Sequence, residues 1–260
     1  MNRFENYQGT IKYNGNSFLF SRAEMSDAEQ LARMYANISI NAENYRIRFD
    51  PSSEQSFARV GGMFEIHTRE SIESEIKSGR SFFAVLKDTD GDIAASFWVS
   101  EEDPHFSEFA PDTMFGCRSC QCTLTDALRA SKVIYPRELI VNGGRKLPGV
   151  SHAMFYTIFT VMRQNGYTHS LGEVYGVRGY KDGKRAVEIN MLNERSFNVT
   201  AGTGGKYIGD SSEFEVDIGS VTVTIVPRAF CFDYAAMLPG LGQKLMDLGL
   251  EISFTREGTL

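Results

Sequence analysis

The chain has 260 residues, of which 42% are hydrophobic and 12% aromatic, which is enough apolar material for a sizeable core in one large domain or two small ones. Its formal net charge of −6 disfavours a general nucleic-acid-binding protein, because such proteins usually present a basic face. No apolar run approaches the ~20 residues that cross a bilayer, and residues 1–6 lack the apolar core of a signal peptide, so we expect a cytoplasmic protein without a membrane span.

The first elements in chain order are a strand and a helix. An apolar run predicts the strand at 17–20. Ser26 and Glu29 have the spacing of a capping box, which predicts that a helix begins here and carries apolar residues on one face up to Ile38. Residues 41–66 show no regular pattern, and we expect an irregular insertion there.

A hairpin is the clearest pattern in the next part of the chain. Thr68 is a favourable N-cap for a second helix, which precedes the hairpin. Apolar runs follow at 81–86 and 93–99, and Asp88-Thr89-Asp90-Gly91 between them is typical of a turn. Residues 102–130 then form a second long insertion.

The second half of the chain continues to alternate strands and helices. A strand is predicted at 132–141, and a long amphipathic helix follows a glycine-rich loop. The later expected elements are a strand at 169–177, a polar loop at 178–184, a helix from about 190 to 203, a hairpin of strands at 213–218 and 221–226, and a helix at 235–248. This order predicts an α/β chain with a mixed sheet.

The glycine-rich loop between the strand and the long helix is the most informative segment. The start of a helix carries unpaired backbone N–H groups and the positive end of the helix dipole. Glycines at 143 and 144 let an anion approach that backbone closely, and Arg145 and Lys146 add positive charge. We therefore predict that this segment holds a pyrophosphate.

Two motifs carry a resemblance to a known family, because they share its order and spacing. Val141 is followed by Lys146-Leu147-Pro148-Gly149-Val150-Ser151, and Asn193-Glu194-Arg195-Ser196 is followed eleven residues on by Gly204 and Gly205. Over residues 17–226 the chain resembles the GCN5-related N-acetyltransferase (GNAT) superfamily, whose signature is Arg/Gln-x-x-Gly-x-Gly/Ala at a helix start and a later Asn-x-x-Ala/Ser. Lys146 and Ser151 depart from that signature.

The resemblance implies a fold and a domain organisation. The fold is a mixed, mostly antiparallel central sheet with splayed fourth and fifth strands, flanked by helices. It implies one domain over residues 1–260 with its core at 17–226, insertions at 41–66 and 102–130, and a C-terminal extension at 227–260.

The resemblance also implies acetyl-CoA as co-substrate and an amine, on a small molecule or a peptide, as acceptor. The pyrophosphate is expected on the helix start, and the pantetheine arm along the preceding strand. The implied cofactor-binding residues are Leu139, Ile140, Val141, Arg145, Lys146, Leu147, Pro148, Gly149, Val150, Ser151, Asn193 and Ser196. The acceptor is expected to enter from the other side, under residues 41–66. Neither a nucleic acid partner nor a metal is implied, and a homodimer stays open.

Acyl transfer to an amine needs a base for the amine and an acid for the leaving thiolate. The resemblance makes Glu138, three residues before Val141, the candidate base. Thr200 stands where the family acid, a tyrosine, is expected, so Tyr175 and Tyr207 are the candidate replacements. A backbone N–H near Ile140 or Val141 is expected to meet the oxyanion.

Other chemistries find less support in the residues. Cys117, Cys120 and Cys122 supply one cysteine knuckle without a second, so we expect free thiols and no metal. The histidines, His67 among them, are expected to be structural or on the surface. Two alternatives to an N-acetyltransferase stay open: a long-chain N-acyl amino acid or acyl-homoserine-lactone-type synthase that uses an acyl-carrier protein, and a non-catalytic acyl-CoA sensor.

Overall fold

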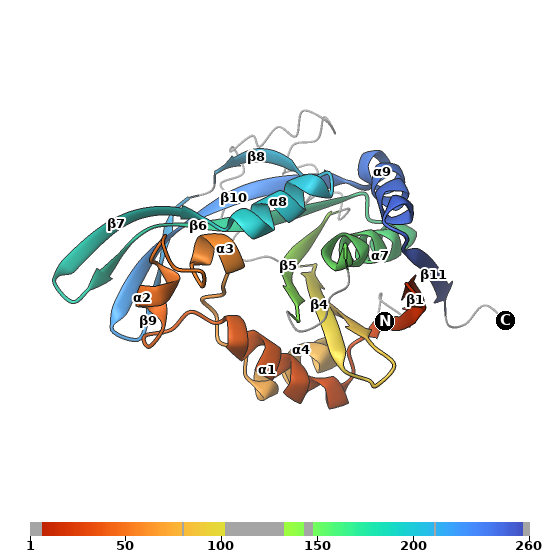
Figure 1. Cartoon of the computed structure of the whole chain (residues 1–260), viewed down its shortest axis with the longest axis horizontal. Coiled ribbons are helices and arrows are strands. Elements are labelled where there is room, and N and C mark those ends of the chain that lie inside the picture. The colour runs from red at the N-terminus through yellow and green to blue at the C-terminus, as the bar shows by residue number, and fades with distance from the viewer. Residues whose placement is uncertain (1–6, 80, 102–132, 143–147, 211, 257–260) are drawn as a thin grey trace.

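A computed structural model describes residues 7–79, 81–101, 133–142, 148–210 and 212–256 (Figure 1). The insertion predicted at 102–130 and loop residues 143–147 lie outside this part. The described strands are β1 (Tyr7–Tyr13), β2 (Asn16–Arg22), β3 (Ser81–Lys87), β4 (Ile93–Ser100), β5 (Val133–Val141), β6 (His169–Asp182), β7 (Arg185–Leu192), β8 (Lys206–Asp210), β9 (Phe214–Ile218), β10 (Val221–Asp233) and β11 (Glu251–Arg256).

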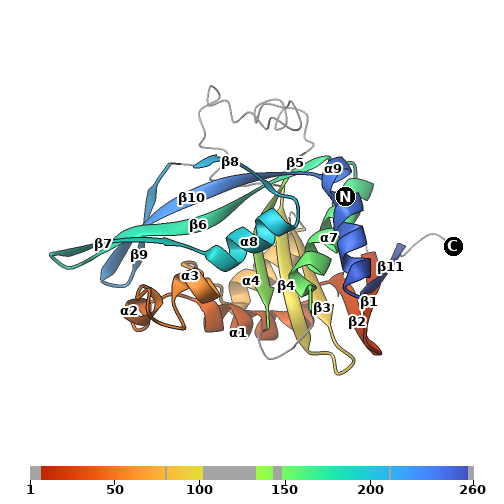
Figure 2. The same ribbon diagram turned by 45° about the horizontal axis from the view of Figure 1, so that its top comes forward.

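The described helices divide between the two faces of this sheet. They are the 3-10 helix η1 (Met25–Asp27) and the α-helices α1 (Ala28–Ile38), α2 (Tyr45–Arg48), α3 (Phe57–Val60), α4 (Arg69–Ser78), α7 (Val150–Gln164), α8 (Glu194–Gly202) and α9 (Tyr234–Asp247). Helices α1 and α4 cover one face, and α7 with α9 covers the other (Figures 1 and 2). None of the described helices is both long and apolar enough to span a membrane.

The eleven described strands form one sheet in the order β11-β1-β2-β3-β4-β5-β6-β10-β8, with β7 on β6 and β9 on β10. Strands β5 and β6 are parallel, and the other described pairs are antiparallel. The β5–β6 ladder holds only Val133 opposite His169 and Ile134 opposite Ser170, after which the strands separate. The next residues of β5, Tyr135 and Pro136, pair with Ser100 and Val99 of β4 and not with β6. The predicted sheet with two splayed strands is confirmed.

The central strands β3 and β4 alternate between two cores. Phe82, Ala84 and Phe97 belong to the cluster on the side of α7, whereas Phe83 and Trp98 belong to the cluster on the side of α1. All eight residues of β4 are buried, because helices cover both faces. Adjacent residues of β4 and β5 therefore face opposite layers, which matters for the side chains of β5 described below.

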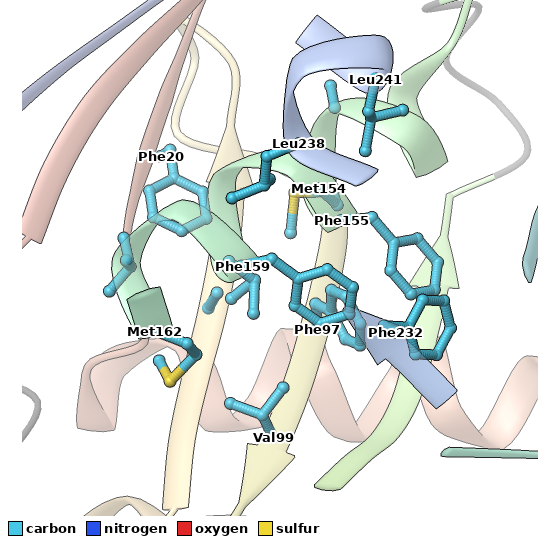
Figure 3. Close-up of a cluster of buried hydrophobic side chains, with 14 of the residues drawn as sticks. Phe20, Phe97, Val99, Met154, Phe155, Phe159, Met162, Phe232, Leu238 and Leu241 are labelled. Atoms are coloured by element: carbon cyan, nitrogen blue, oxygen red, sulfur yellow. The ribbon is translucent and has the colours of Figure 1, made fainter. Parts of the chain in front are cut away.

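The larger core is built around α7 and is rich in aromatic rings (Figure 3). The ring of Phe159 lies 5.3 Å from Phe155, 5.1 Å from Phe232 and 4.9 Å from Tyr234, between centroids. Offset and edge contacts of this kind add to the free energy gained by burial. This packing fixes α7 against the sheet and so places its N-terminus beside β5.

The N-terminal region differs from the prediction in two details, the position of a capping box and the presence of an additional strand. The capping box is formed by Glu24 and Asp27 at η1 rather than by Ser26 and Glu29, with the Glu24 N–H donating to Asp27 Oδ2 over 2.9 Å. A strand that the sequence analysis missed, β1, precedes the expected first strand and pairs with both β2 and β11. Buried residues alternate with more exposed ones along β1, among them Gln8 and Lys12, so the strand contains no apolar run that would predict it.

The region after α7 differs most from the prediction. Strand β6 runs to Asp182 through the predicted polar loop, turns at Gly183 with φ +59°, and returns as β7. The predicted helix near residue 190 begins only after Asn193, which caps α8. Both strands carry polar side chains because they form an arm that reaches out from the body of the protein (Figure 1). Strand β8 was also missed, and β10 extends to Asp233 rather than to 226.

The predicted insertion and extension have defined places in the fold. Residues 41–66 hold the short helices α2 and α3 and return to α1 through a bridge between Ser39 and Met63. The C-terminal extension supplies α9, which packs on α7, and β11, which lies beside β1 at the end of the sheet (Figure 2).

We predict that Phe159→Ala lowers the free energy of unfolding by about 3–5 kcal/mol, because the ring is fully buried and its loss leaves a cavity among other rings. Urea unfolding followed by circular dichroism measures the change. The control is Met246→Ala on α9, where the side chain is 61% exposed and a loss within about 0.5 kcal/mol is expected. Equal losses in the two variants would contradict this description of the core.

Candidate active site

A cavity of about 270 Å³ lies where β5 and β6 separate. Its walls are β5 from Pro136 to Val141, β6 from Gly172 to Tyr175, the first turn of α7 at Ser151, and α8 from Asn193 to Thr200. The loop from Val60 to Glu65 and the end of α1 close it on the opposite side. The cavity therefore opens to both layers of the protein through one gap in the sheet.

One backbone edge of β5 borders this gap. From Tyr135 to Val141 the strand pairs with β4 along its other edge, and no described strand pairs with the edge that faces β6 beyond Ile134. Leu139, Ile140 and Val141 all line the cavity. An extended chain with amide groups could add to such an edge as a further strand.

The start of α7 lies at the same cavity. Gly149 is its N-cap in the left-handed conformation, with φ +71°, and supplies no side-chain cap. Ser151 lines the cavity, Val150 is buried in the core, and Pro148 is exposed. The predicted residues Arg145, Lys146 and Leu147 lie outside the described part.

The start of α8 is the second helix end at the cavity. Asn193 is 8% exposed, and its Oδ1 accepts the backbone N–H of Ser196 over 3.0 Å. Both residues line the cavity. A Cβ at Gly61 would lie 2.8 Å from Asn193 Nδ2, so the glycine allows the α3 loop to approach α8 this closely. The capping oxygen is thus in use, and the predicted cofactor contacts of Asn193 and Ser196 stay predictions.

Glu138 is the buried carboxylate of the cavity. It stands opposite Trp98 in the β4–β5 register, its side chain is 13% exposed, and its Oε1 lies 3.0 Å from His67 Nε2. Its other oxygen, Oε2, is buried without a hydrogen-bond partner among the described residues. A buried carboxylate with an unused acceptor atom is a chemically reasonable site for a proton.

His67 connects Glu138 to a second carboxylate. Its side chain is 8% exposed, and Nε2 also lies 3.6 Å from Oε2 of Glu65, which is 54% exposed at the mouth. Burial by itself would lower the pKa of His67, but the hydrogen bond and charge of Glu138 and the charge of Glu65 outweigh it and raise the pKa above its usual value. The sequence alone predicted a structural or surface role for His67, because its partner lies 71 residues away.

The two tyrosines proposed as the acid differ in their position relative to the cavity, and Thr200 stands where the family acid is expected. Tyr175 on β6 and Thr200 on α8 both line the cavity. Tyr207 lies on β8 with 52% exposure, and its hydroxyl donates to Asp210 over 2.7 Å. It is not among the residues that line the cavity, so the structure does not bring Tyr207 together with Glu138.

The sequence matches no protein-family model and no curated protein sequence. Three solved structures are similar in fold. They are an uncharacterized protein from Bacillus halodurans (9% identity, 94% of this chain and 98% of that chain covered, TM-score 0.54), RimJ from Mycobacterium smegmatis in complex with CoA-disulfide (12%, 95% and 96%, 0.51), and an acetyltransferase of the GNAT family from Listeria monocytogenes (13%, 83% and 98%, 0.45).

The chain has the GNAT fold. The two matches with TM-scores of 0.54 and 0.51 extend over nearly the whole of both chains, and the sheet has the splayed pair that the resemblance implies. In this GNAT fold the splayed strands are β5 and β6, and the helix that follows the first of them is α7.

We predict that Gly149→Ala destabilises the protein by more than Gly166→Ala, as measured by urea unfolding. Both glycines have positive φ, which costs an alanine about 1–2 kcal/mol. A Cβ at Gly149 would also lie 2.9 Å from Leu248 Cδ1, whereas a Cβ at Gly166 meets nothing within 4 Å. Equal losses would show that the Leu248 side chain, which is 39% exposed, moves aside without cost.

Proposed function

We propose that this protein is an N-acyltransferase that transfers an acetyl group from acetyl-CoA to an amine. The observation that carries the proposal is the buried carboxylate of Glu138 on the same strand, β5, whose free edge borders the gap. A cofactor arm on that edge and an amine near that carboxylate would meet within one cavity. The GNAT fold and the CoA ligand of the M. smegmatis structure support the same assignment.

The chain offers two groups for the cofactor. The N-terminus of α7, with Gly149 as its N-cap, carries backbone N–H groups and a positive dipole, which suit a pyrophosphate. Leu139, Ile140 and Val141 would pair with the amide groups of the pantetheine arm. Arg145 and Lys146 would add charge beside the pyrophosphate.

The chemistry is a direct transfer. The lone pair of the amine forms a bond to the thioester carbon, and Glu138 takes a proton from the attacking nitrogen. The carbon–sulfur bond then breaks with its electron pair on sulfur, and the sulfur receives a proton. We assign that second proton to the Tyr175 hydroxyl, because this residue lines the cavity and Tyr207 does not. A backbone N–H of β5 would meet the oxyanion during the transfer.

A non-catalytic acyl-CoA-binding protein is the second candidate. It is favoured by Thr200, which is buried at the cavity where the family acid is expected, and whose hydroxyl is a weak acid. Calorimetry with acetyl-CoA and a thiol-release assay with a panel of amines separate the two. Binding without thiol release on any amine would favour this candidate over the enzyme.

We predict that Glu138→Gln lowers turnover at pH 7 by about 10²–10⁴-fold, because the amide cannot accept the proton of the amine. The affinity for acetyl-CoA should stay within about twofold, since the carboxylate contributes no group to the pyrophosphate end. The matched control is Glu188→Gln on β7, the same chemical change at an exposed position. Unchanged turnover in Glu138→Gln would show that another group is the base.

We predict that Ser151→Asp weakens acetyl-CoA binding by about tenfold in calorimetry, because it places a negative charge at the proposed pyrophosphate site. The same charge in the first turn of α7 should stabilise the helix by about 0.3–1 kcal/mol. These effects have opposite signs, so weaker binding could not be explained by a weaker fold. Ser151→Ala is the neutral control. Binding as tight as in the native protein would place the pyrophosphate elsewhere.

A further inference from the structure

The interaction between His67 and Glu138 goes beyond what the GNAT fold requires. The two side chains come from segments 71 residues apart and meet over 3.0 Å on the side of the sheet that faces α1. His67 does not line the cavity, whereas Glu138 does. The histidine therefore acts on the cavity only through the carboxylate.

The surroundings of His67 hold it in this position. Its ring packs 4.6 Å from Tyr35 of α1 and 5.5 Å from Trp98 of β4, between centroids. The charged groups that face it are Glu138 and Arg137 from β5 and Glu65 from the segment before α4. Arg137 in turn lies over the Trp98 ring, 4.7 Å from its centroid.

We propose that His67 and Glu138 form one proton-accepting unit, in which His67 positions the carboxylate and the charge of His67 controls whether the carboxylate accepts the proton of the amine. This inference rests on the proposed function. His67 is a positioning residue, since it touches the base and not the reacting atoms.

The physical reason is the charge next to the base. With a proton on both ring nitrogens, His67 is a cation hydrogen-bonded to Glu138 Oε1, and like charges repel, so this cation opposes the arrival of a further proton 3.0 Å away. When His67 loses its proton, that opposition disappears. Because Glu138 and Glu65 raise the pKa of His67, the change falls above the usual pKa of about 6.5.

The sign of the pH dependence follows directly. As the pH rises through the pKa of His67, the fraction of neutral His67 increases and turnover should rise with it. Below that pKa the neutral fraction falls about tenfold per pH unit. The proton that Glu138 takes from the nitrogen passes to water after transfer, so the unit returns to its starting state.

The test compares the native protein with His67→Gln, which keeps an N–H donor of similar reach but cannot titrate. Thiol release is measured from pH 5.5 to 9 with acetyl-CoA and one accepted amine, and the ratio of the two rates at each pH cancels the ionisation of the amine. We expect this ratio to rise at least fivefold in favour of His67→Gln as the pH falls from 8.5 to 6. His67→Phe, which loses the donor, should be slow at every pH.

The control is His169→Gln on β6, away from the cavity, where burial lowers the pKa of the histidine. It should follow the native pH profile. A ratio for His67→Gln that does not change with pH would overturn the inference while leaving the proposed function intact. Absence of thiol release by the native protein with any amine would instead overturn the proposed function and the inference with it.

A second measurement does not depend on activity or on the folding of the His67 variants. Nuclear magnetic resonance of ring-labelled histidines gives the pKa of His67 in the native protein and in Glu138→Gln. We expect the value to fall in the variant, because the hydrogen bond to a carboxylate is lost. An unchanged pKa would show that the two groups do not titrate as one unit and would overturn the inference.

Discussion

The early end of the β5–β6 ladder is the constraint on which the rest of the site depends. Two residue pairs join these strands, and from Tyr135 onward β5 pairs only with β4 among the described strands. Every backbone group of β5 on that side then needs another partner or water. The fold tolerates the gap because β4 pairs with the other edge of β5 up to Val141, and because α7 packs firmly over the strand. The break in the sheet is therefore an opening whose β5 side is held in place by β4 and α7.

Successive side chains of β5 point to opposite faces of the sheet, and this alternation decides on which side each functional group lies. Glu138 points to the layer of α1, opposite Trp98, whereas Leu139 packs with the layer of α7. The proposed base and the proposed cofactor edge thus belong to one short segment but serve opposite sides of the sheet. A shift of register by one residue would exchange these faces and would bury the carboxylate in the aromatic core around Phe159.

The sequence predicted those parts that depend on local patterns. The hairpin of β3 and β4 and the helix α7 follow from turn residues and apolar periodicity. Glu138 was named from the family resemblance, and its role as a base stays a prediction. Strand β6 was predicted only as far as Val177. The polar residues that follow were assigned to a loop and to a helix from about residue 190, whereas Asn193 marks the true start of α8. His67 was missed for another reason. Its role comes from a contact across 71 residues, which no local pattern records.

The polar groups beneath the sheet are costly to fold, and that cost is itself informative. The Tyr35 hydroxyl and Glu138 Oε2 are both buried beneath the sheet, and taking such groups out of water costs free energy. Burial and the charge of Glu138 raise the pKa of Tyr35 well above its usual value, so this hydroxyl stays protonated beside the carboxylate. The proposed proton transfer would give a function to this buried carboxylate, which a histidine holds beside the gap between β5 and β6.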